Sequence, residues 1–117
     1  MTKMNPEVKK LWVEALRSPK YKQQRHQLRD GTTNSMCCLG VLCDVSGLGR
    51  WLAVGEYDCG EGDINGFRPT SAVAKWAGID SDMVWQVEIN GVMDDLARHN
   101  DNGRTFLEIA DAIEAQL

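Results

Sequence analysis

The clearest pattern of apolar and polar positions lies near the amino terminus, in the stretch MNPEVKKLWVEALRSPK. Its apolar residues recur at helical spacing and predict one buried face: Val8, Leu11, Trp12, Ala15 and Leu16. Asn5 is placed to cap this helix, and Pro6 suits its first position. Because Pro19 disfavours helical geometry in the residue before it, the pattern predicts that the helix ends at Ser18.

A second helix is predicted over residues 36–45, which are apolar on every side except at Gly40 and Asp44. This pattern is typical of a helix that is buried all round. Ser35 or Asn34 is expected to cap it. Gly40 is expected to mark a close crossing with another helix, because glycine leaves room for a neighbouring backbone.

Two other segments show no helical pattern. Residues 20–30, KYKQQRHQLRD, have no apolar period, so we expect a loop or an edge strand that Tyr21 and Leu28 anchor. The stretch RWLAVGEY predicts a strand, interrupted at Gly55, from its alternating residues Trp51, Ala53 and Tyr57. A glycine-rich loop, DCGEGDINGFRP, follows it.

The next part of the chain predicts a short helix and a strand. Thr70 or Ser71 starts the helix, Gly78 ends it, and its apolar stripe is Val73, Trp76 and Ala77. The stretch MVWQVEING predicts a half-buried strand from the alternation of Trp85, Val87 and Ile89. Asn90 and Gly91 then form a turn signal.

The carboxy-terminal part predicts two helices. The first is VMDDLARHN, through Met93, Leu96 and Ala97. The second begins at the T-x-x-E capping box of Thr105 and Glu108, and its buried face is Phe106, Ile109, Ala110, Ile113 and Leu117. The pattern as a whole predicts a single helix-rich α+β domain over residues 1–117, with two or three short antiparallel strands.

Composition supports a folded domain, since 43% of the 117 residues are apolar and 26% are charged. Of the four tryptophans, we expect Trp12 and Trp76 inside and at least one of Trp51 and Trp85 at an interface. No apolar run approaches the ~20 residues that a membrane-spanning helix needs. The polar amino terminus lacks the apolar stretch of a secretory signal, so we expect a cytoplasmic, reducing location and no membrane partner.

Charge is divided unevenly along the chain. Residues 1–30 carry eight Lys and Arg against three acids, whereas residues 31–117 carry five against fourteen. A basic head on an acidic body can steer a partner of complementary charge. The candidate partner-binding residues are Lys20, Lys22, Arg25, Arg29 and Trp85. A solvated helix surface is the alternative interpretation.

The four cysteines raise the question of a metal site: Cys37, Cys38, Cys43 and Cys59. Their spacing does not resemble paired C-x₂-C zinc ligands, and adjacent cysteines on a helix point in different directions. A reducing compartment disfavours a disulfide. We therefore expect no metal, no cofactor, and cysteines that pack in the core.

Cys37 is the best candidate for a nucleophile, because the amino terminus of a helix stabilises a thiolate. His26 or His99 would then serve as the base. No recognisable signature surrounds either histidine, and solvent exposure explains His99 in RHNDNG equally well. The sequence therefore favours core cysteines and assigns no catalytic residue.

The loop EGDINGF matches the first half of a calcium loop, with oxygen ligands at Glu61, Asp63 and Asn65 and glycine at Gly66. Ala72 occupies the position of the bidentate carboxylate, so the second half of the motif is missing. A polar turn is the preferred interpretation.

Five stretches in order along the chain resemble small, largely uncharacterised proteins encoded by tailed phages and prophages: NPEVKKLWVEALRS, YKQ, CCLGVLCD, WAG and NDNGRTFLEIADAIE. The octet from Cys37 to Asp44 and the stretch from Asn100 are the most specific. Arg98 and His99 stand where a leucine-like residue is usual, which argues against His99 as a shared catalytic base.

The resemblance implies a phage setting, in which small proteins without catalytic signatures act by binding a host component. We therefore expect a non-enzymatic inhibitor of a host protein or complex, such as an anti-phage defence system, in the manner of anti-CRISPR and other counter-defence proteins. The fold alone does not establish such a role.

Two alternatives remain open. One is a sponge that sequesters a nucleotide-derived immune signal, with an aromatic platform and cations drawn from Trp51, Tyr57, Arg50, Arg68 and Arg104; Trp76 or Trp85 could also provide the platform. The other is a cysteine-dependent hydrolase or transferase.

Overall fold

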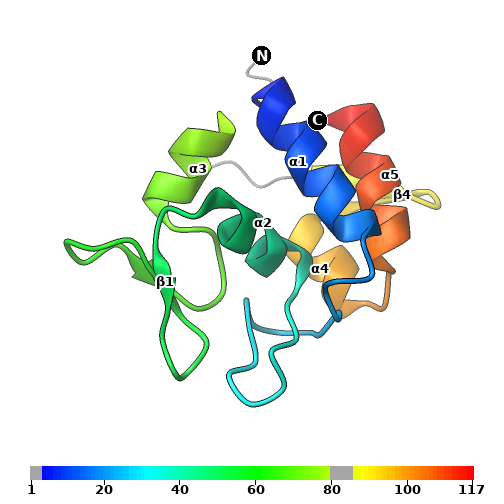
Figure 1. Cartoon of the computed structure of the whole chain (residues 1–117). Helices are drawn as coiled ribbons and strands as arrows, with labels where there is room; N and C mark the ends of the chain where they lie inside the picture. Colours follow the sequence, from blue (N-terminus) through cyan, green and yellow to red (C-terminus); the bar gives the residue numbers. More distant parts are fainter. Residues whose placement is uncertain (1–3, 80–85) are drawn as a thin grey trace.

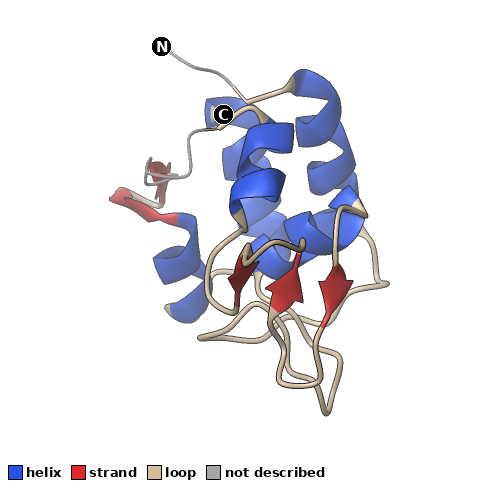
Figure 2. Ribbon diagram, turned by 90° about the vertical axis from the view of Figure 1, so that its left-hand side faces the viewer, coloured by secondary structure: helices blue, strands red, loops and turns tan. Residues whose placement is uncertain are grey.

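The computed structural model describes residues 4–79 and 86–117, which form five helices and two small antiparallel sheets (Figure 1). The helices are α1 (Pro6–Arg17), α2 (Cys38–Ser46), α3 (Ser71–Ala77), α4 (Leu96–Asp101) and α5 (Phe106–Gln116). One sheet has the order β1 (Arg50–Trp51), β2 (Tyr57–Asp58) and β3 (Ile64–Asn65), and the other pairs β4 (Gln86–Ile89) with β5 (Val92–Asp95). Figure 2 shows the two sheets as separate groups of strands beside the helices.

The predicted helix-rich α+β class is confirmed. The described residues contain five short strands, where the sequence predicts two or three. Within the same ranges, no helix has the length and apolar character needed to cross a bilayer.

Helix α2 lies at the centre of the core and packs against α1, α3 and α4. Its residues from Cys38 to Cys43 are all buried, as the unbroken apolar run predicts. The indole Nε1 of Trp12 donates a 2.9 Å hydrogen bond to the carbonyl oxygen of Cys38. This bond satisfies a buried polar group and fixes α1 against α2.

Two details at α2 differ from expectation. The N-cap is Cys37, not Ser35 or Asn34, because the Cys37 amide donates a 3.1 Å bond to the Leu28 carbonyl and the chain stays extended to that point. Gly40 faces a loop and not another helix, since a Cβ atom there would overlap the carbonyl oxygen of Leu28. Gly40 is therefore a close-approach position, but its neighbour is the backbone of segment 20–30.

The N-caps predicted for α1, α3 and α5 are all present: Asn5, Thr70 and Thr105. Each side chain accepts a hydrogen bond from a backbone amide in the first turn of its helix, which satisfies a group that the helix itself leaves unpaired. The capping box with Glu108 is also confirmed. On α1, Val13 is buried and Leu11 is exposed, so the predicted buried face is wrong at that position.

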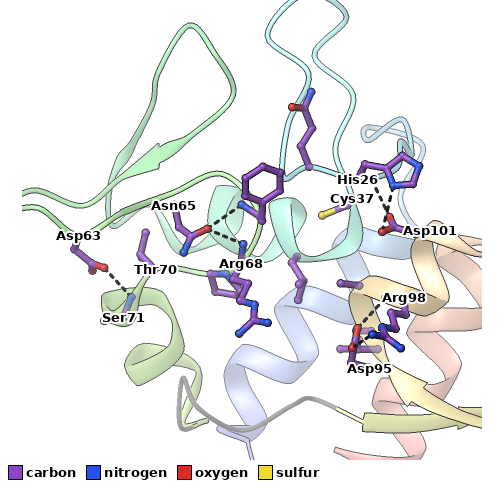
Figure 3. Close-up of a pocket in the computed structure, with 16 residues that line it drawn as sticks. His26, Cys37, Asp63, Asn65, Arg68, Thr70, Ser71, Asp95, Arg98 and Asp101 are labelled. Atoms are coloured by element: carbon purple, nitrogen blue, oxygen red, sulfur yellow. Dashed lines mark hydrogen bonds and ion pairs between the residues drawn. The ribbon is translucent and has the colours of Figure 1, made fainter.

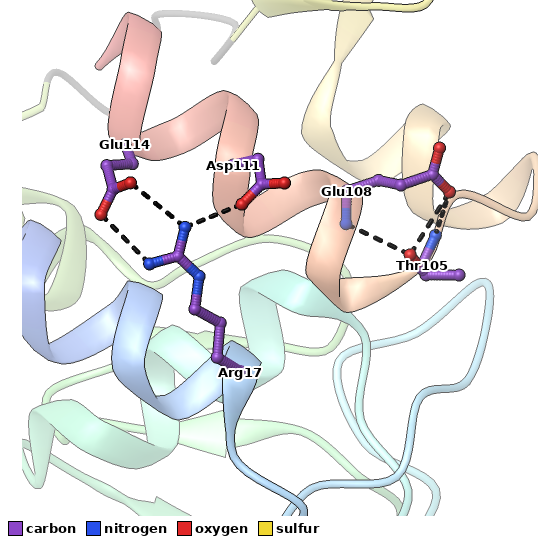
Figure 4. A network of polar contacts seen from close by, with 5 residues as sticks. All are labelled: Arg17, Thr105, Glu108, Asp111 and Glu114. Atoms are coloured by element: carbon purple, nitrogen blue, oxygen red, sulfur yellow. Dashed lines mark hydrogen bonds and ion pairs between the residues drawn. The ribbon is translucent and has the colours of Figure 1, made fainter.

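Helices α1 and α5 lie side by side, and Arg17 links their surfaces (Figure 4). Its guanidinium donates to Asp111 at 2.8 Å and to the two carboxylate oxygens of Glu114 at 3.1 and 3.2 Å. The two acids raise the pKa of Arg17, and in return the pKa of Glu114 is lowered. Exposed ion pairs of this kind orient two helices more than they stabilise them.

The stretch RWLAVGEY forms a hairpin of β1 and β2, so the prediction of one strand is wrong. The Leu52 amide bonds to the Glu56 carbonyl at 2.8 Å, and the Gly55 amide bonds to the Leu52 carbonyl at 2.9 Å. Gly55 has a φ of 94°, a backbone conformation that glycine adopts without strain. The chain therefore reverses at the residue that interrupts the apolar alternation.

Residues 92–95 form β5, so the prediction that a helix starts in this segment is wrong. Asn90 and Gly91 have φ values of 52° and 82°, which makes the predicted turn and leads the chain back along β4. Helix α4 begins only afterwards, where Asp95 caps it by accepting a 2.8 Å bond from the Arg98 amide.

Segment 20–30 is a loop that the core holds firmly. Leu28 is fully buried, and the Tyr21 hydroxyl donates a 2.6 Å hydrogen bond to Asp44, so both predicted anchors are confirmed. Burial and the neighbouring Asp44 carboxylate raise the pKa of Tyr21.

Buried Asn100 ties the same segment to two helices. Its Oδ1 accepts from the Cys38 amide at 3.2 Å and from Gln23 Nε2 at 2.9 Å, and its Nδ2 donates to the Gln24 carbonyl at 2.6 Å. One side chain thus joins α4, the start of α2 and the loop.

Candidate functional site

A polar cleft of about 530 Å³ opens on one side of the molecule (Figure 3). Its walls are the segment from β3 to α3 (residues 63–71), the start of α2, residues from both ends of α4, and loop residues 26 and 27. A volume of this size lies in the range of small-molecule sites. The cleft is therefore the candidate functional site within the described residues.

Three carboxylates line the cleft, and each is already bonded to backbone amides. Asp63 accepts from the amides of Ser71 and Ala72 at 2.9 and 3.0 Å, so it caps α3 from across the loop. Asp95 caps α4, as described above. Asp101 accepts a 2.8 Å bond from the amide of His26. These acids hold the walls of the cleft in place.

Cationic and aromatic side chains complete the cleft. Arg68 and Arg98 lie on opposite sides of it in Figure 3. Arg98 has one ion pair, a 3.7 Å contact with Asp95, and Arg68 has none with any residue that the structure describes. Phe67 is 69% exposed at the rim.

The loop sequence explains how Phe67 and Arg68 are presented. Asn65 Oδ1 accepts hydrogen bonds from the amides of both residues, at 2.9 and 3.0 Å. This arrangement is an Asx-type turn, for which Asn followed by Gly66 is well suited. The side chains of Asp63 and Asn65 are thus engaged with backbone amides, which agrees with a polar turn in this loop.

Cys37 lines the cleft but is only 5% exposed. Burial is the largest influence on its thiol and raises the pKa to about 11, although the amides of Gly40 and Leu39 lower it. The group is therefore a protonated thiol at neutral pH. Cys38 and Cys43 are buried as well, with thiol pKa values also raised by burial, so the expectation of core cysteines is confirmed for these three.

Neither histidine is arranged as a base for Cys37. The ring Nδ1 of His26 lies 3.5 Å from an Asp101 oxygen, and in Figure 3 the Cys37 sulfur points away from this ring. His99 is 1% exposed, and its Nε2 lies 2.8 Å from the carbonyl oxygen of Val87. The expectation that His99 is exposed is wrong, because the ring links α4 to β4.

The structure does not assemble the residues proposed for a nucleotide sponge. Tyr57 is buried, and Trp51 packs against it and donates to Asp44 at 3.0 Å. Arg50 pairs with Asp58 at 3.6 Å and Arg104 with Glu108 at 3.7 Å. Of this proposed set, Arg68 is the member that lines the cleft. Trp76, the other platform candidate and an expected core residue, is half-buried against the core.

The proposed partner-binding residues differ in their surroundings. Lys20, Lys22 and Arg25 are exposed. Arg29 is half-buried, donates a 2.8 Å bond to Asn34 and lies over the Trp51 ring at 5.7 Å. Trp85 lies outside the described residues. The same segment, residues 20–30, contributes residues 26 and 27 to the lining of the cleft.

Sequence reasoning missed Phe67 and Arg98 as site residues. Phe67 lies in a glycine-rich loop outside every apolar pattern, which is a usable signal, since an aromatic residue there has no core face to join. The sequence around Arg98 gives no such signal, because this side chain lines the cleft only as a result of where α4 packs in the fold.

The fold and the cleft define a small helix-rich α+β protein with a polar cleft in its described part. Residues 4–117 match the family described as Domain of unknown function (DUF8296), and the chain belongs to that family. No curated protein and no solved structure matches the chain significantly.

Proposed function

We propose that this protein is a non-enzymatic binding protein that attaches to a host component and inhibits it. The observation that carries the proposal is the cleft, which exposed Phe67 lines together with Arg68 and Arg98. Aromatic and arginine side chains dominate the energetics of binding surfaces. The resemblance to phage proteins supports a host defence component as the target.

The chemistry of the cleft supports binding over catalysis. A nucleophilic cysteine needs a lowered pKa, a base within hydrogen-bond reach, and access for the substrate. Cys37 has a raised pKa and is buried, and the imidazole of His26, which lines the same cleft, is paired with Asp101. A cysteine-dependent hydrolase or transferase would require all three conditions to change.

Retention from a host extract tests the proposal. The tagged protein is incubated with extract, and the retained proteins and small molecules are identified by mass spectrometry. We expect one major retained component at a defined stoichiometry, whose own activity falls when the protein is added. The double variant Phe67→Ala, Arg68→Glu should lose it, and the control Leu107→Ala, Arg50→Glu should keep it, because these exposed residues lie outside the cleft.

Equal retention by both double variants would contradict a role for the cleft. Recovery of the component in a chemically altered form would contradict a non-enzymatic role.

The basic segment is tested by reversing Lys20, Lys22 and Arg25 to Glu together. Arg29 is left unchanged, because its contacts with Asn34 and Trp51 would be lost. If this segment steers the component, we expect slower association and a flatter salt dependence, with unchanged stability. An unchanged association rate would show that these three charges only solvate the surface and do not steer the component.

A further inference from the structure

We infer that the cleft binds a nucleoside phosphate, with the phosphate between Arg68 and Arg98 and the base against Phe67. The inference rests on the proposed function, because it names the ligand class of the same cleft. It replaces the aromatic platform that the sequence suggested, Trp51 and Tyr57, since Tyr57 is buried and half-buried Trp51 packs against it.

The phosphate site follows from the two arginines. Both guanidinium groups line the same cleft and approach it from opposite sides (Figure 3). Arg68 has no ion pair with any described residue, and the 3.7 Å contact of Arg98 with Asp95 is long for a hydrogen bond. A planar guanidinium group can bind a phosphate through two parallel hydrogen bonds, which the ammonium group of a lysine cannot do. Two arginines therefore suit a phosphate ligand.

The three carboxylates of the cleft do not prevent anion binding. Asp63 uses both oxygens to accept from backbone amides, and one oxygen each of Asp95 and Asp101 does the same. The dipoles of these amides offset part of the negative charge. The second oxygens of Asp95 and Asp101 face Arg98 and His26. Within the described residues, Arg68 therefore pairs with no carboxylate of the cleft, and Arg98 has the one 3.7 Å contact with Asp95.

The base site follows from Phe67 and Gln27. The Phe67 ring is 69% exposed, and the bond from its amide to Asn65 fixes its backbone. A phenyl ring stacks on the flat face of any base. Gln27 lines the same cleft and carries an amide, which can both donate to and accept from a base edge. The cleft volume of about 530 Å³ is adequate for one nucleotide.

Isothermal titration calorimetry on the purified full chain tests the inference. The probes are the four nucleoside 5′-monophosphates, the matching nucleosides and inorganic phosphate. We expect at least one monophosphate to bind about tenfold or more tightly than its nucleoside and than phosphate alone, since both subsites contribute. Its affinity should fall with added salt.

Variants assign the binding to the cleft. Arg68→Ala should weaken the monophosphate about tenfold or more without affecting the nucleoside, and Phe67→Ala should weaken both about fivefold or more. Arg50→Ala and Leu107→Ala are the controls and should bind as the parent does. All four residues are exposed, so circular dichroism and thermal unfolding should be unchanged.

Three results would overturn the inference: no heat of binding from any monophosphate at millimolar concentration, an affinity that Arg68→Ala leaves unchanged, or phosphate alone binding as tightly as the nucleotide. The proposed function would survive each of them if a host protein is still retained through Phe67 and Arg68. If no host protein is retained but a nucleotide binds tightly, the inference about the ligand stands. The function would then be sequestration of that ligand.

Discussion

Replacing Asn100 with alanine should destabilise the fold strongly. The side chain is 1% exposed and makes hydrogen bonds to three partners: the Cys38 amide, the Gln23 side chain and the Gln24 carbonyl. Alanine removes all three hydrogen bonds.

The loss of stability depends on which hydrogen bonds each of the three partners retains in the variant. Gln23 Nε2 retains a 2.7 Å bond to the Arg104 carbonyl, so its loss is small. The Cys38 amide is buried and is left unpaired, which costs about 2 kcal/mol, whereas the half-buried Gln24 carbonyl costs about 1 kcal/mol. The expected loss is therefore about 3 kcal/mol, a large fraction of the stability of a domain of this size.

Urea unfolding followed by circular dichroism measures this loss, because a single domain of this length is expected to unfold in one step. Asn102→Ala is the matched control, since Asn102 is exposed, and its effect should stay within about 0.5 kcal/mol. If Asn100→Ala loses no more than the control, the three hydrogen bonds contribute little and the reasoning from burial is refuted.

Two further predictions concern α2. The contribution of Cys37 to the unfolding free energy should fall by about 2 kcal/mol as pH rises from 9 to 11, because the unfolded thiol ionises near its ordinary pKa of 9.0 while the pKa of the folded thiol is about 11. Burial also raises the thiol pKa values of Cys38 and Cys43, so Cys37→Ala should reduce the slope in urea titrations at each pH without removing it. Gly40→Ala should destabilise by more than about 2 kcal/mol, because its Cβ would overlap the Leu28 carbonyl, and a gain of about 1 kcal/mol, as helix propensity alone predicts, would contradict this contact.

The features predicted correctly from sequence are those that short-range interactions determine. Asn5, Thr70 and Thr105 each cap a helix through an amide no more than three residues away, so the residues that decide the outcome are adjacent in the sequence. The turn at Asn90 and Gly91 is local in the same sense. Burial of α2 is also readable, since no polar face exists on which the helix could meet solvent.

The features that were missed depend on contacts between distant residues. The sequence of β5 alternates poorly, and it is a strand because the turn lays it along β4. His99 is buried because β4 offers the carbonyl of Val87 to its ring. The cleft joins residues 26, 37, 68 and 98 from four separate segments, and no local pattern places these side chains together.

The residues that carry the phage resemblance are used mainly to build the scaffold. Asn100 joins α4 to α2 and to segment 20–30, Asp101 holds the backbone of His26, and Asp44 accepts from Tyr21 and Trp51.

The side chains proposed to bind a ligand, Phe67 and Arg68, lie between the resembling stretches, in the loop from β3 to α3. Loops on a rigid scaffold can change their side chains without changing the fold. If the proposed cleft binds a ligand, we expect residues 63–71 to determine its identity and the resembling stretches to determine the scaffold. A relative that keeps the Asn100 contacts but replaces Phe67 and Arg68 should fold in the same way and bind a different partner.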